Sequence, residues 1–438
     1  MHPRVLIVGT VPYNPKMTSR AFKAYFSFWE KENLAQVFSN PQEPIKGHCG
    51  RLYQITDARL LKKALGKKLS VGKRYVYEDL SDSPAQDTAE AHKRGIIPFL
   101  YKIGSRKNSF SCLMRKWLWK KSRWCTDDFN SWLDDFSPEC VFLSFSDDFF
   151  IPTIALYVAE RFDIPIVSSI GDDYYFNHRF SLNPFYFLYR GLYKKLIRSV
   201  FAHGGSAIYI SDKIRDKYNS EFALDGKTVY LCSEIERREF RPVNTENPSV
   251  CYFGNIRQGR NESLSDIAYA LGRINPSYRL TVCSGQNDRD IVKVLTDNPF
   301  IDFLGAIPYE EVKKRSADAD VLVIVEGFKK KHINYTRYSL STKAADSLAS
   351  GAAILVYGSR ECGVIEYMRS TDAATVCTNK DQLEESIRKL FFDVAYQKAL
   401  CDKAKIISEK NHREESCNAA CESVITEVVE SYAKSNHV

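Results

Sequence analysis

Short apolar segments alternate with longer amphipathic stretches along this chain of 438 residues, and they do so in two series. The first series consists of residues 5–8, 35–38, 139–144, 165–169, 207–210 and 227–230. The second consists of residues 250–253, 279–283, 301–304, 321–325, 353–356 and 374–376. Strands that alternate with helical patterns form βαβ units and parallel sheets, so the sequence predicts two doubly wound α/β domains. Residues 45–107 show no clear pattern.

A polar segment flanked by prolines separates the two series and is typical of an interdomain linker. It covers residues 240–248, so we expect an N-terminal domain over 1–240 and a C-terminal domain over 249–414. A chain of this length accommodates two domains, each with its own core. The pattern from residue 380 onward is helical almost throughout, and we expect residues 415–438 to cross back to the N-terminal domain.

The composition excludes several classes of protein. The hydrophobic fraction of 44% and the charged fraction of 26% are those of a globular protein. No apolar segment approaches the ~18 residues of a transmembrane helix. The chain begins with a strand-like segment and lacks the pattern of a signal peptide, which favours a cytoplasmic protein. Twelve cysteines occur without a CxxC pair, so we expect buried, reduced thiols and no zinc site.

Residues 94–124 hold the excess positive charge. The net charge is +8, but this segment alone contains nine Lys and Arg and no Asp or Glu, which leaves −1 for the rest of the chain. It also contains Trp117, Trp119 and Trp124, and we predict one long helix over 110–136. Tryptophan and basic residues favour an anionic membrane surface. Single-stranded nucleic acid and plain helix packing with solvated lysines are the alternatives; we expect the membrane and no nucleic acid partner.

In open parallel sheets, ligands bind beyond the carboxyl ends of the strands. Gly9 begins the turn after the first strand, but this turn has neither the GxGxxG pattern of a dinucleotide site nor a P-loop. The absence of the GxGxxG pattern is evidence against a dinucleotide-dependent dehydrogenase. In the loop after residue 253, Gly254 permits close approach of a ligand, and Arg257 and Arg260 could clamp a diphosphate. The alternative is a solvated loop with exposed arginines.

A helix that begins near residue 341 offers a second group of candidates. With Ser341 or Thr342 as its cap, Lys343 lies in the first turn beside unbonded backbone amides, where a cation suits a leaving diphosphate. Asp346 lies three residues further on the same face and suits ribose hydroxyls. The alternative is a surface Lys–Asp pair worth under ~1 kcal/mol.

Five segments carry a resemblance to a known family. They are residues 254–260 (GNIRQGR), 301–311 (IDFLGAIPYEE), 317–323 (ADADVLV), 341–351 (STKAADSLASG) and 353–355 (AIL). In order and spacing they resemble the GT-B retaining glycosyltransferases of family four, nucleotide-sugar-dependent enzymes of bacterial polysaccharide and glycolipid assembly. The resemblance is clear over residues 249–370 and weaker in the N-terminal half. It implies two Rossmann-like domains that face each other across a cleft.

The resemblance assigns roles to residues of the C-terminal half. The basic pair that holds the donor diphosphate in this family falls on Asn255 and Arg260, and Arg257 compensates for the arginine missing at Asn255. The Glu-x7-Glu motif of the family places its second acid, the ribose ligand, at Asp346. Its first acid falls on Tyr338, so that half of the motif is missing.

Three further assignments follow from the same resemblance. Lys343 resembles the lysine of the Ser-x-Lys variant found in capsule and lipopolysaccharide transferases, with Ser341 at its start. The segment from Gly305 to Ile307 resembles the one whose backbone reads the nucleobase, and Gly285 resembles its neighbour.

The N-terminal half carries fewer assignments. Gly9 resembles the glycine of the first donor-facing loop. Asp172 and Asp173 follow the strand that ends at residue 170, where the family often carries His or Asp. They either hold an acceptor hydroxyl near the reaction centre or cap the next helix.

The resemblance implies an enzyme that moves a hexose from a UDP- or GDP-sugar to a glycan or lipid-linked acceptor, with retention and without a metal or other cofactor. Cations stabilise the departing nucleoside diphosphate while the acceptor attacks from the same face. The implied process is bacterial surface polysaccharide synthesis, of capsule or lipopolysaccharide, at the inner face of the cytoplasmic membrane. Because Asn255 and Tyr338 depart from the family pattern, the alternative is a catalytically silent nucleotide-sugar-binding subunit that supports a partner transferase.

Overall fold

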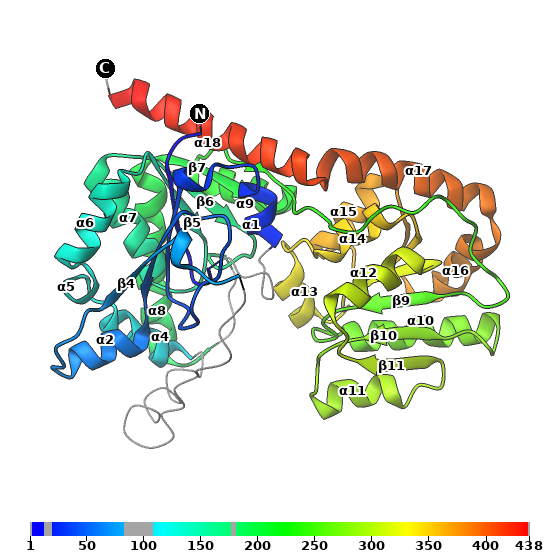
Figure 1. The fold of residues 1–438 in the computed structure, drawn as a ribbon. Coiled ribbons are helices and arrows are strands. Elements are labelled where there is room, and N and C mark those ends of the chain that lie inside the picture. Colours follow the sequence, from blue (N-terminus) through cyan, green and yellow to red (C-terminus); the bar gives the residue numbers. More distant parts are fainter. Residues whose placement is uncertain (1, 13–19, 83–107, 177–180, 437–438) are drawn as a thin grey trace. The chain divides into compact units, whose positions relative to one another are not determined.

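The computed structural model describes residues 2–12, 20–82, 108–176 and 181–436. The chain forms two compact units (Figure 1). Unit 1 consists of Met1–Tyr209, Arg215–Thr228 and Asn418–Val438, and unit 2 consists of Ile210–Ile214 and Val229–Cys417.

The sheet of unit 1 has eight strands in the order β4-β3-β2-β1-β5-β6-β7-β8. Neighbouring strands are parallel, except for the antiparallel pair of β3 and β4. The strands are β1 (Val5–Val8), β2 (Leu34–Phe38), β3 (Arg51–Ile55), β4 (Gly72–Val76), β5 (Cys140–Ser144), β6 (Ile166–Ile170), β7 (Gly205–Tyr209) and β8 (Lys227–Thr228). The six strands predicted for this half are therefore confirmed, with β8 shorter than expected. The sequence analysis predicts neither β3 nor β4, which lie within residues 45–107. Four of the five residues of β3 are buried, whereas only the first residue of the edge strand β4 is buried.

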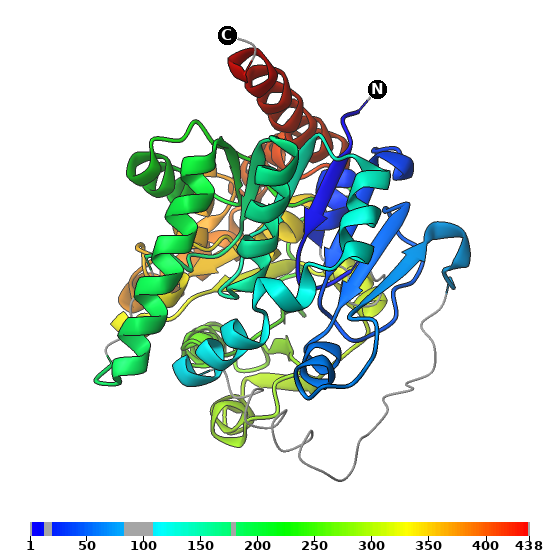
Figure 2. The same cartoon turned by 90° about the vertical axis from the view of Figure 1, so that its left-hand side faces the viewer.

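Helices cover both faces of this sheet (Figures 1 and 2). They are α1 (Arg20–Phe26), α2 (Asp57–Ala64), α4 (Ser109–Leu118), α5 (Lys121–Trp124), α6 (Asp127–Phe136), α7 (Phe150–Phe162), α8 (Pro184–His203) and α9 (Asp212–Phe222). The single helix predicted over 110–136 is wrong, since α4, α5 and α6 occupy this stretch. The backbone is extended at Lys120, with ψ 135°. It is extended again at Thr126, whose hydroxyl accepts the N–H of Phe129 at 3.2 Å and caps α6.

The sheet of unit 2 has six strands, all parallel, in the order β11-β10-β9-β12-β13-β14. They are β9 (Val250–Phe253), β10 (Leu280–Cys283), β11 (Ile301–Gly305), β12 (Val321–Val325), β13 (Ala353–Tyr357) and β14 (Thr375–Cys377). All six lie where the sequence predicts them. Val321 and Val323 of β12 pack in one core cluster and Ile324 in another, so this strand is covered on both faces.

The helices of unit 2 alternate with its strands, as a doubly wound sheet requires. They are α10 (Arg260–Ile274), α11 (Arg289–Thr296), α12 (Tyr309–Asp318), α13 (Lys330–Thr336), α14 (Lys343–Ser350), α15 (Gly363–Thr371), α16 (Leu383–Phe392) and α17 (Val394–Asn411). The segment before β9 also belongs to this unit. The Ser233 hydroxyl donates to Asp346 at 2.7 Å, and the N–H of Arg238 donates to the Ser350 carbonyl at 3.1 Å.

The last helix, α18 (Glu414–Asn436), belongs to unit 1 from Asn418 onward. The Asn418 amide donates to the Ser27 hydroxyl at 2.9 Å and to the Lys23 carbonyl at 3.2 Å. Further along, the Tyr432 hydroxyl donates to Asp163 at 3.2 Å. Within the described ranges we find no helix with the length and hydrophobicity needed to cross a bilayer.

Candidate functional site

Backbone hydrogen bonds connect the carboxyl ends of three neighbouring strands of unit 2, β9, β10 and β11. The N–H of Gly254, after β9, donates to the Cys283 carbonyl at 2.9 Å, and the N–H of Ser284, after β10, donates to the Gly305 carbonyl at 2.8 Å. The predicted residues Gly254, Gly285 and Gly305 therefore lie along one edge of the sheet. The strand order reverses between β9 and β12, and ligands of doubly wound sheets bind at such a switch point.

Lys343, from the first turn of α14, lies against Gly254. A Cβ built on Gly254 would lie 2.6 Å from Lys343 Cε and 2.9 Å from Nζ, so a side chain at position 254 would displace the lysine. The ammonium nitrogen is also 5.3 Å from the ring centroid of Tyr252, which is buried within β9. The fold thus places one predicted cation at the end of the strand beside the switch point.

Arg260 forms an ion pair with Glu326, a residue that the sequence analysis does not single out. Arg260 Nη2 lies 2.6 Å from Glu326 Oε1 and Nε lies 3.1 Å from Oε2, with the two side chains 13% and 3% exposed. Arg260 begins α10 and Glu326 directly follows β12, so the pair connects the segments on the two sides of the switch point. The carboxylate balances the charge that Arg260 would bring to a diphosphate. Its position just after an apolar strand is the sequence signal that could have found it.

In the loop after β9, Asn255 and Arg257 are exposed, whereas Ile256 is buried. The side chain of Asn255 accepts the N–H of Arg257 at 2.8 Å, which shapes the loop, and Arg257 Nη2 lies 3.4 Å from Gln286 Oε1. Gly259 has a φ of +78° and precedes α10. A Cβ on Gly259 would lie 2.3 Å from His332 Nδ1, so only glycine fits there.

At the start of α14, the predicted capping residues make only weak contacts. Ser341 Oγ accepts the N–H of Lys343 at 3.4 Å, and Thr342 makes no side-chain cap. Asp346 accepts from the Ser233 hydroxyl at 2.7 Å. Lys343 and Asp346 therefore share a helix turn but contact different segments. Ile307 is partly buried in the turn after β11.

Gly9 and Asp172 belong to unit 1, and the other predicted site residues belong to unit 2. Gly9 donates its N–H to the Val37 carbonyl at 3.0 Å, and a Cβ there would lie 3.1 Å from Ser144 Oγ, so it packs closely between β2 and β5. Asp172 is exposed after β6, and the Tyr174 hydroxyl lies 3.5 Å from its carboxylate.

Its neighbour Asp173 has contacts that stabilise unit 1. It accepts the N–H of Phe176 at 2.8 Å and the hydroxyl of Tyr218 at 2.9 Å. Burial raises the pKa of Asp173 above its usual range. Of the two aspartates, Asp172 is thus the one exposed to a ligand.

The tryptophans of the basic segment divide between the core and the surface. Trp119 and Trp124 are 3% and 0% exposed, and Trp119 stacks on Phe150 with ring centroids 3.9 Å apart. Trp117 is 55% exposed. Of the nine cations in the segment, Arg94, Lys102, Arg106 and Lys107 lie outside the described residues.

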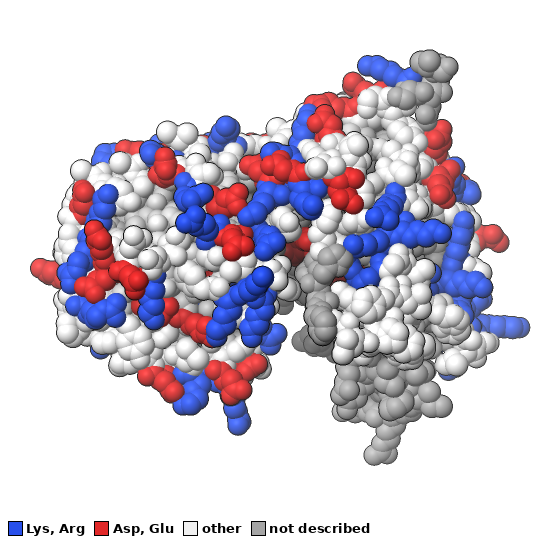
Figure 3. Space-filling view, turned by 180° about the vertical axis from the view of Figure 1, so that it is seen from behind, with Lys and Arg blue, Asp and Glu red and all other residues white. Residues whose placement is uncertain are grey.

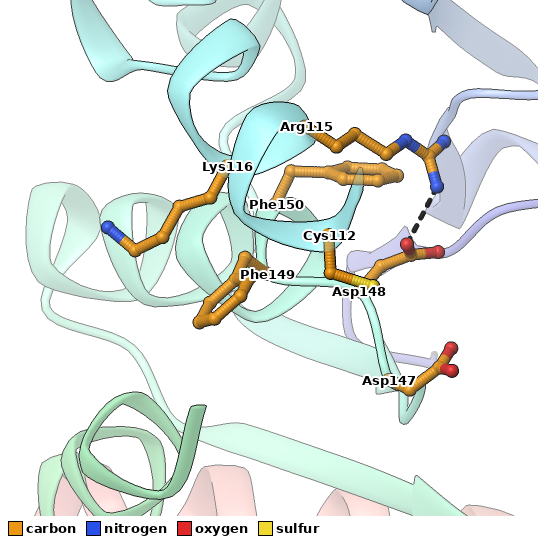
Figure 4. Close-up of a pocket in the computed structure, with 7 residues that line it drawn as sticks. All are labelled: Cys112, Arg115, Lys116, Asp147, Asp148, Phe149 and Phe150. Atoms are coloured by element: carbon orange, nitrogen blue, oxygen red, sulfur yellow. Dashed lines mark hydrogen bonds and ion pairs between the residues drawn. The ribbon is translucent and has the colours of Figure 1, made fainter. Parts of the chain in front are cut away.

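A small hollow lies between α4 and the start of α7 (Figure 4). Arg115 Nη1 lies 2.7 Å from Asp148 Oδ1, and its Nε lies 2.9 Å from Asp57 Oδ2, so this arginine is held within unit 1. The hollow is lined by Cys112, Arg115, Lys116, Asp147, Asp148, Phe149 and Phe150.

The described residues contain no cluster of three His, Cys, Asp or Glu that could hold a metal ion. All twelve cysteines are free, and ten of them are buried, as predicted. Burial raises the pKa of the Cys362 thiol to about 11 and that of Cys140 to about 12, so both are protonated at neutral pH.

Comparison by sequence finds no matching family profile and no similar curated protein. Comparison of folds finds solved structures that are similar over the whole chain. Anabaena HepE in complex with UDP-glucose superposes with a TM-score of 0.56 and 9% identity, over 97% of this chain and 100% of that one. Sucrose-phosphate synthase from Thermosynechococcus elongatus superposes with a TM-score of 0.56 and 11% identity, over 98% of this chain and 99% of that one. An alpha,alpha-trehalose-phosphate synthase (UDP-forming) from Burkholderia vietnamiensis superposes with a TM-score of 0.56 and 9% identity, over 98% of this chain and 100% of that one.

These similar structures are GT-B glycosyltransferases. At identities of 9–11% the likeness defines the fold. The predicted GT-B architecture of two Rossmann-like α/β units is therefore confirmed.

Proposed function

We propose that this protein is a glycosyltransferase that uses a nucleotide sugar as its donor. The observation that carries the proposal is the position of Lys343, whose ammonium group lies against Gly254 at the switch point of the unit 2 sheet. A cation at the start of α14 adds to the positive end of the helix dipole, and both attract phosphate. HepE in complex with UDP-glucose and the UDP-forming trehalose-phosphate synthase have similar folds, which supports a UDP-sugar donor.

In this proposal, unit 2 binds the donor and the chemistry is retaining. The acceptor hydroxyl forms its bond to the anomeric carbon on the face from which the phosphate oxygen leaves. Its proton passes to an oxygen of the donor phosphate. Lys343 and Arg257 stabilise the charge that accumulates on the nucleoside diphosphate, and Asp346 binds a ribose hydroxyl. The ion pair with Glu326 fixes Arg260 at the start of α10, and in this proposal Arg260 is a further contact to the diphosphate.

The finer assignments complete the proposal. We further propose that the enzyme is a retaining member of family four, with a hexose as the sugar and UDP or GDP as the carrier. The reaction needs no metal, because Lys343 and Arg257 supply the positive charge. The acceptor is a glycan or a lipid-linked oligosaccharide of bacterial surface polysaccharide synthesis, such as capsule or lipopolysaccharide, reached from the cytoplasmic face of the membrane. Asp172 is the candidate contact to the acceptor.

Nucleotide binding and turnover test the proposal with the full chain. We expect UDP or GDP to raise the melting temperature, because a ligand that binds only the native state stabilises it by mass action. Lys343→Ala should abolish that shift and lower the release of nucleoside diphosphate from the donor by a few hundred-fold, about 3–4 kcal/mol. Lys314→Ala, an exposed lysine of α12, is the matched control.

Two outcomes would contradict the proposed transferase activity. If no nucleoside diphosphate changes the melting temperature, the donor site does not exist. If the donor binds but no turnover follows with lipid-linked or glycan acceptors, the protein is a silent nucleotide-sugar-binding subunit.

A further inference from the structure

Exposed apolar side chains gather at one end of unit 1. On α4, Phe110, Met114 and Trp117 have the spacing i, i+4, i+7 and so share one face of the helix. The first turns of α8 add three more. All six are between 45% and 62% exposed, and they form what we call the apolar patch: Phe110, Met114, Trp117, Phe185, Phe187 and Leu188.

The two helices present one continuous apolar surface. The rings of Phe110 and Phe185 are in edge contact, with centroids 5.5 Å apart, which connects α4 to α8. Figures 1 and 2 show α4 and the beginning of α8 at the same end of the unit. Large exposed apolar surfaces of this kind mark sites of interaction with a protein or a membrane.

The two segments that carry the apolar patch have charges of one sign, although Asp57 and Asp148 of neighbouring segments pair with Arg115. Residues 108–124 and helix α8 together contain nine Lys and Arg and no Asp or Glu. Lys116, Lys120 and Lys121 are exposed, and the guanidinium carbon of Arg123 lies 4.0 Å from the ring centroid of Trp117. In the view from behind, Lys and Arg side chains border an uncharged area of unit 1 (Figure 3).

We infer that the apolar patch is a docking surface for a bilayer that contains anionic lipid. A fluid bilayer accepts single apolar side chains from helix ends without a matching pocket, and each basic residue near an anionic surface adds about a fivefold gain in partitioning. The surrounding cations complement such a surface. This inference goes beyond the proposed transferase and does not depend on it, since lipid binding is measured without donor or acceptor.

The structure also corrects which tryptophans can contact the membrane surface. Trp119 and Trp124 lie in the core of unit 1, so only Trp117 can reach the interface. Three residues of α8 replace them, and α8 lies about 60 residues further along the chain than the basic segment, too far for a local pattern to connect the two.

Cosedimentation of the full chain with vesicles tests the docking surface. We expect binding to phosphatidylcholine vesicles with 30% phosphatidylglycerol, much weaker binding to phosphatidylcholine alone, and a loss of binding as salt rises. The variant Lys116→Gln/Lys120→Gln/Lys121→Gln should lose roughly 100-fold in partitioning. Its control replaces three exposed lysines of unit 2, as Lys314→Gln/Lys405→Gln/Lys410→Gln, and should bind as the unsubstituted chain does.

A second pair of variants tests the apolar part. Phe187→Ser/Leu188→Ser should lose at least tenfold in partitioning, whereas Phe392→Ser/Ile406→Ser, equally exposed in unit 2, should not. Circular dichroism verifies that each variant is folded. The inference is overturned if neutral and anionic vesicles bind equally, or if both test variants bind like their controls. It is also overturned if the chain does not bind vesicles but forms a dimer that Phe187→Ser/Leu188→Ser abolishes. In that case the apolar patch binds a second copy of this chain.

Discussion

Gly254→Ala tests whether the end of β9 must be free of a side chain for Lys343 to reach it. The new Cβ would lie 2.6 Å from Lys343 Cε and 2.9 Å from Nζ, closer than real Cβ contacts. Since the end of a lysine side chain is flexible, we expect the ammonium group to move away rather than the backbone. The new side chain also meets a φ of +132°, which residues other than glycine rarely adopt.

The two effects differ in magnitude and in what they change. Backbone strain lowers the free energy of unfolding by about 1–3 kcal/mol, whether or not Lys343 is present. Displacement of the ammonium group removes about 3–4 kcal/mol of transition-state stabilisation, a few hundred-fold in turnover. In the double variant Gly254→Ala/Lys343→Ala there is no ammonium group left to displace. Its turnover should therefore equal that of Lys343→Ala alone, a coupling of about 3 kcal/mol between the two sites.

Release of nucleoside diphosphate measures turnover, and urea unfolding measures stability. Gly66→Ala is the matched control, because Gly66 has a φ of +81° and no atom within 4 Å of the added Cβ. It should lower stability without changing turnover. If the losses of Gly254→Ala and Lys343→Ala multiply in the double variant, or if Gly254→Ala keeps near-normal turnover, the contact between the two residues is irrelevant and the reasoning is refuted.

Three further predictions concern stability. Glu326→Ala leaves Arg260 buried without its partner and should lower the free energy of unfolding in urea by about 3 kcal/mol, against little change for Glu310→Ala on the surface. Burial lowers the pKa of His412 from 6.5 in the unfolded chain to about 4 in the fold. This neutral histidine therefore contributes its full share of stability above pH 6.5, and the share is lost as the pH falls toward 4. His412→Gln should flatten the dependence of the unfolding free energy on pH between these values; an unchanged profile would show that His412 does not cause it. Thr126→Ala removes the cap of α6 and should cost about 1 kcal/mol in urea unfolding, an expectation that equal stability would contradict.

Most of the strands could be predicted because buried strands are short, continuous runs of apolar residues, which the sequence shows locally. All five residues of β12 are buried, and a continuous run of Val, Leu and Ile is typical of a strand covered on both faces. The break within 110–136 also has a local signal, since Thr126 precedes two aspartates at the start of α6, but hydrophobic periodicity obscures it.

The candidate site is predictable only in part. The sequence indicates which residues follow each strand, and the sheet brings Gly254, Gly285 and Gly305 to one edge. The partner of Arg260 could not be predicted in the same way. Glu326 is 66 residues away, and the distance between them follows from the strand order of the whole sheet.

By itself the sequence determined the two α/β sheets and the residues that stand at the carboxyl ends of their strands, because both depend on the spacing of apolar residues over a few turns. Only the tertiary structure decided that Lys343 lies against Gly254, that Glu326 neutralises Arg260, and that Trp119 is buried while Trp117 is exposed. The reason is physical. A charge or an aromatic ring gives the same local pattern whether it is solvated or paired, and its free energy is set by a partner from a distant part of the chain.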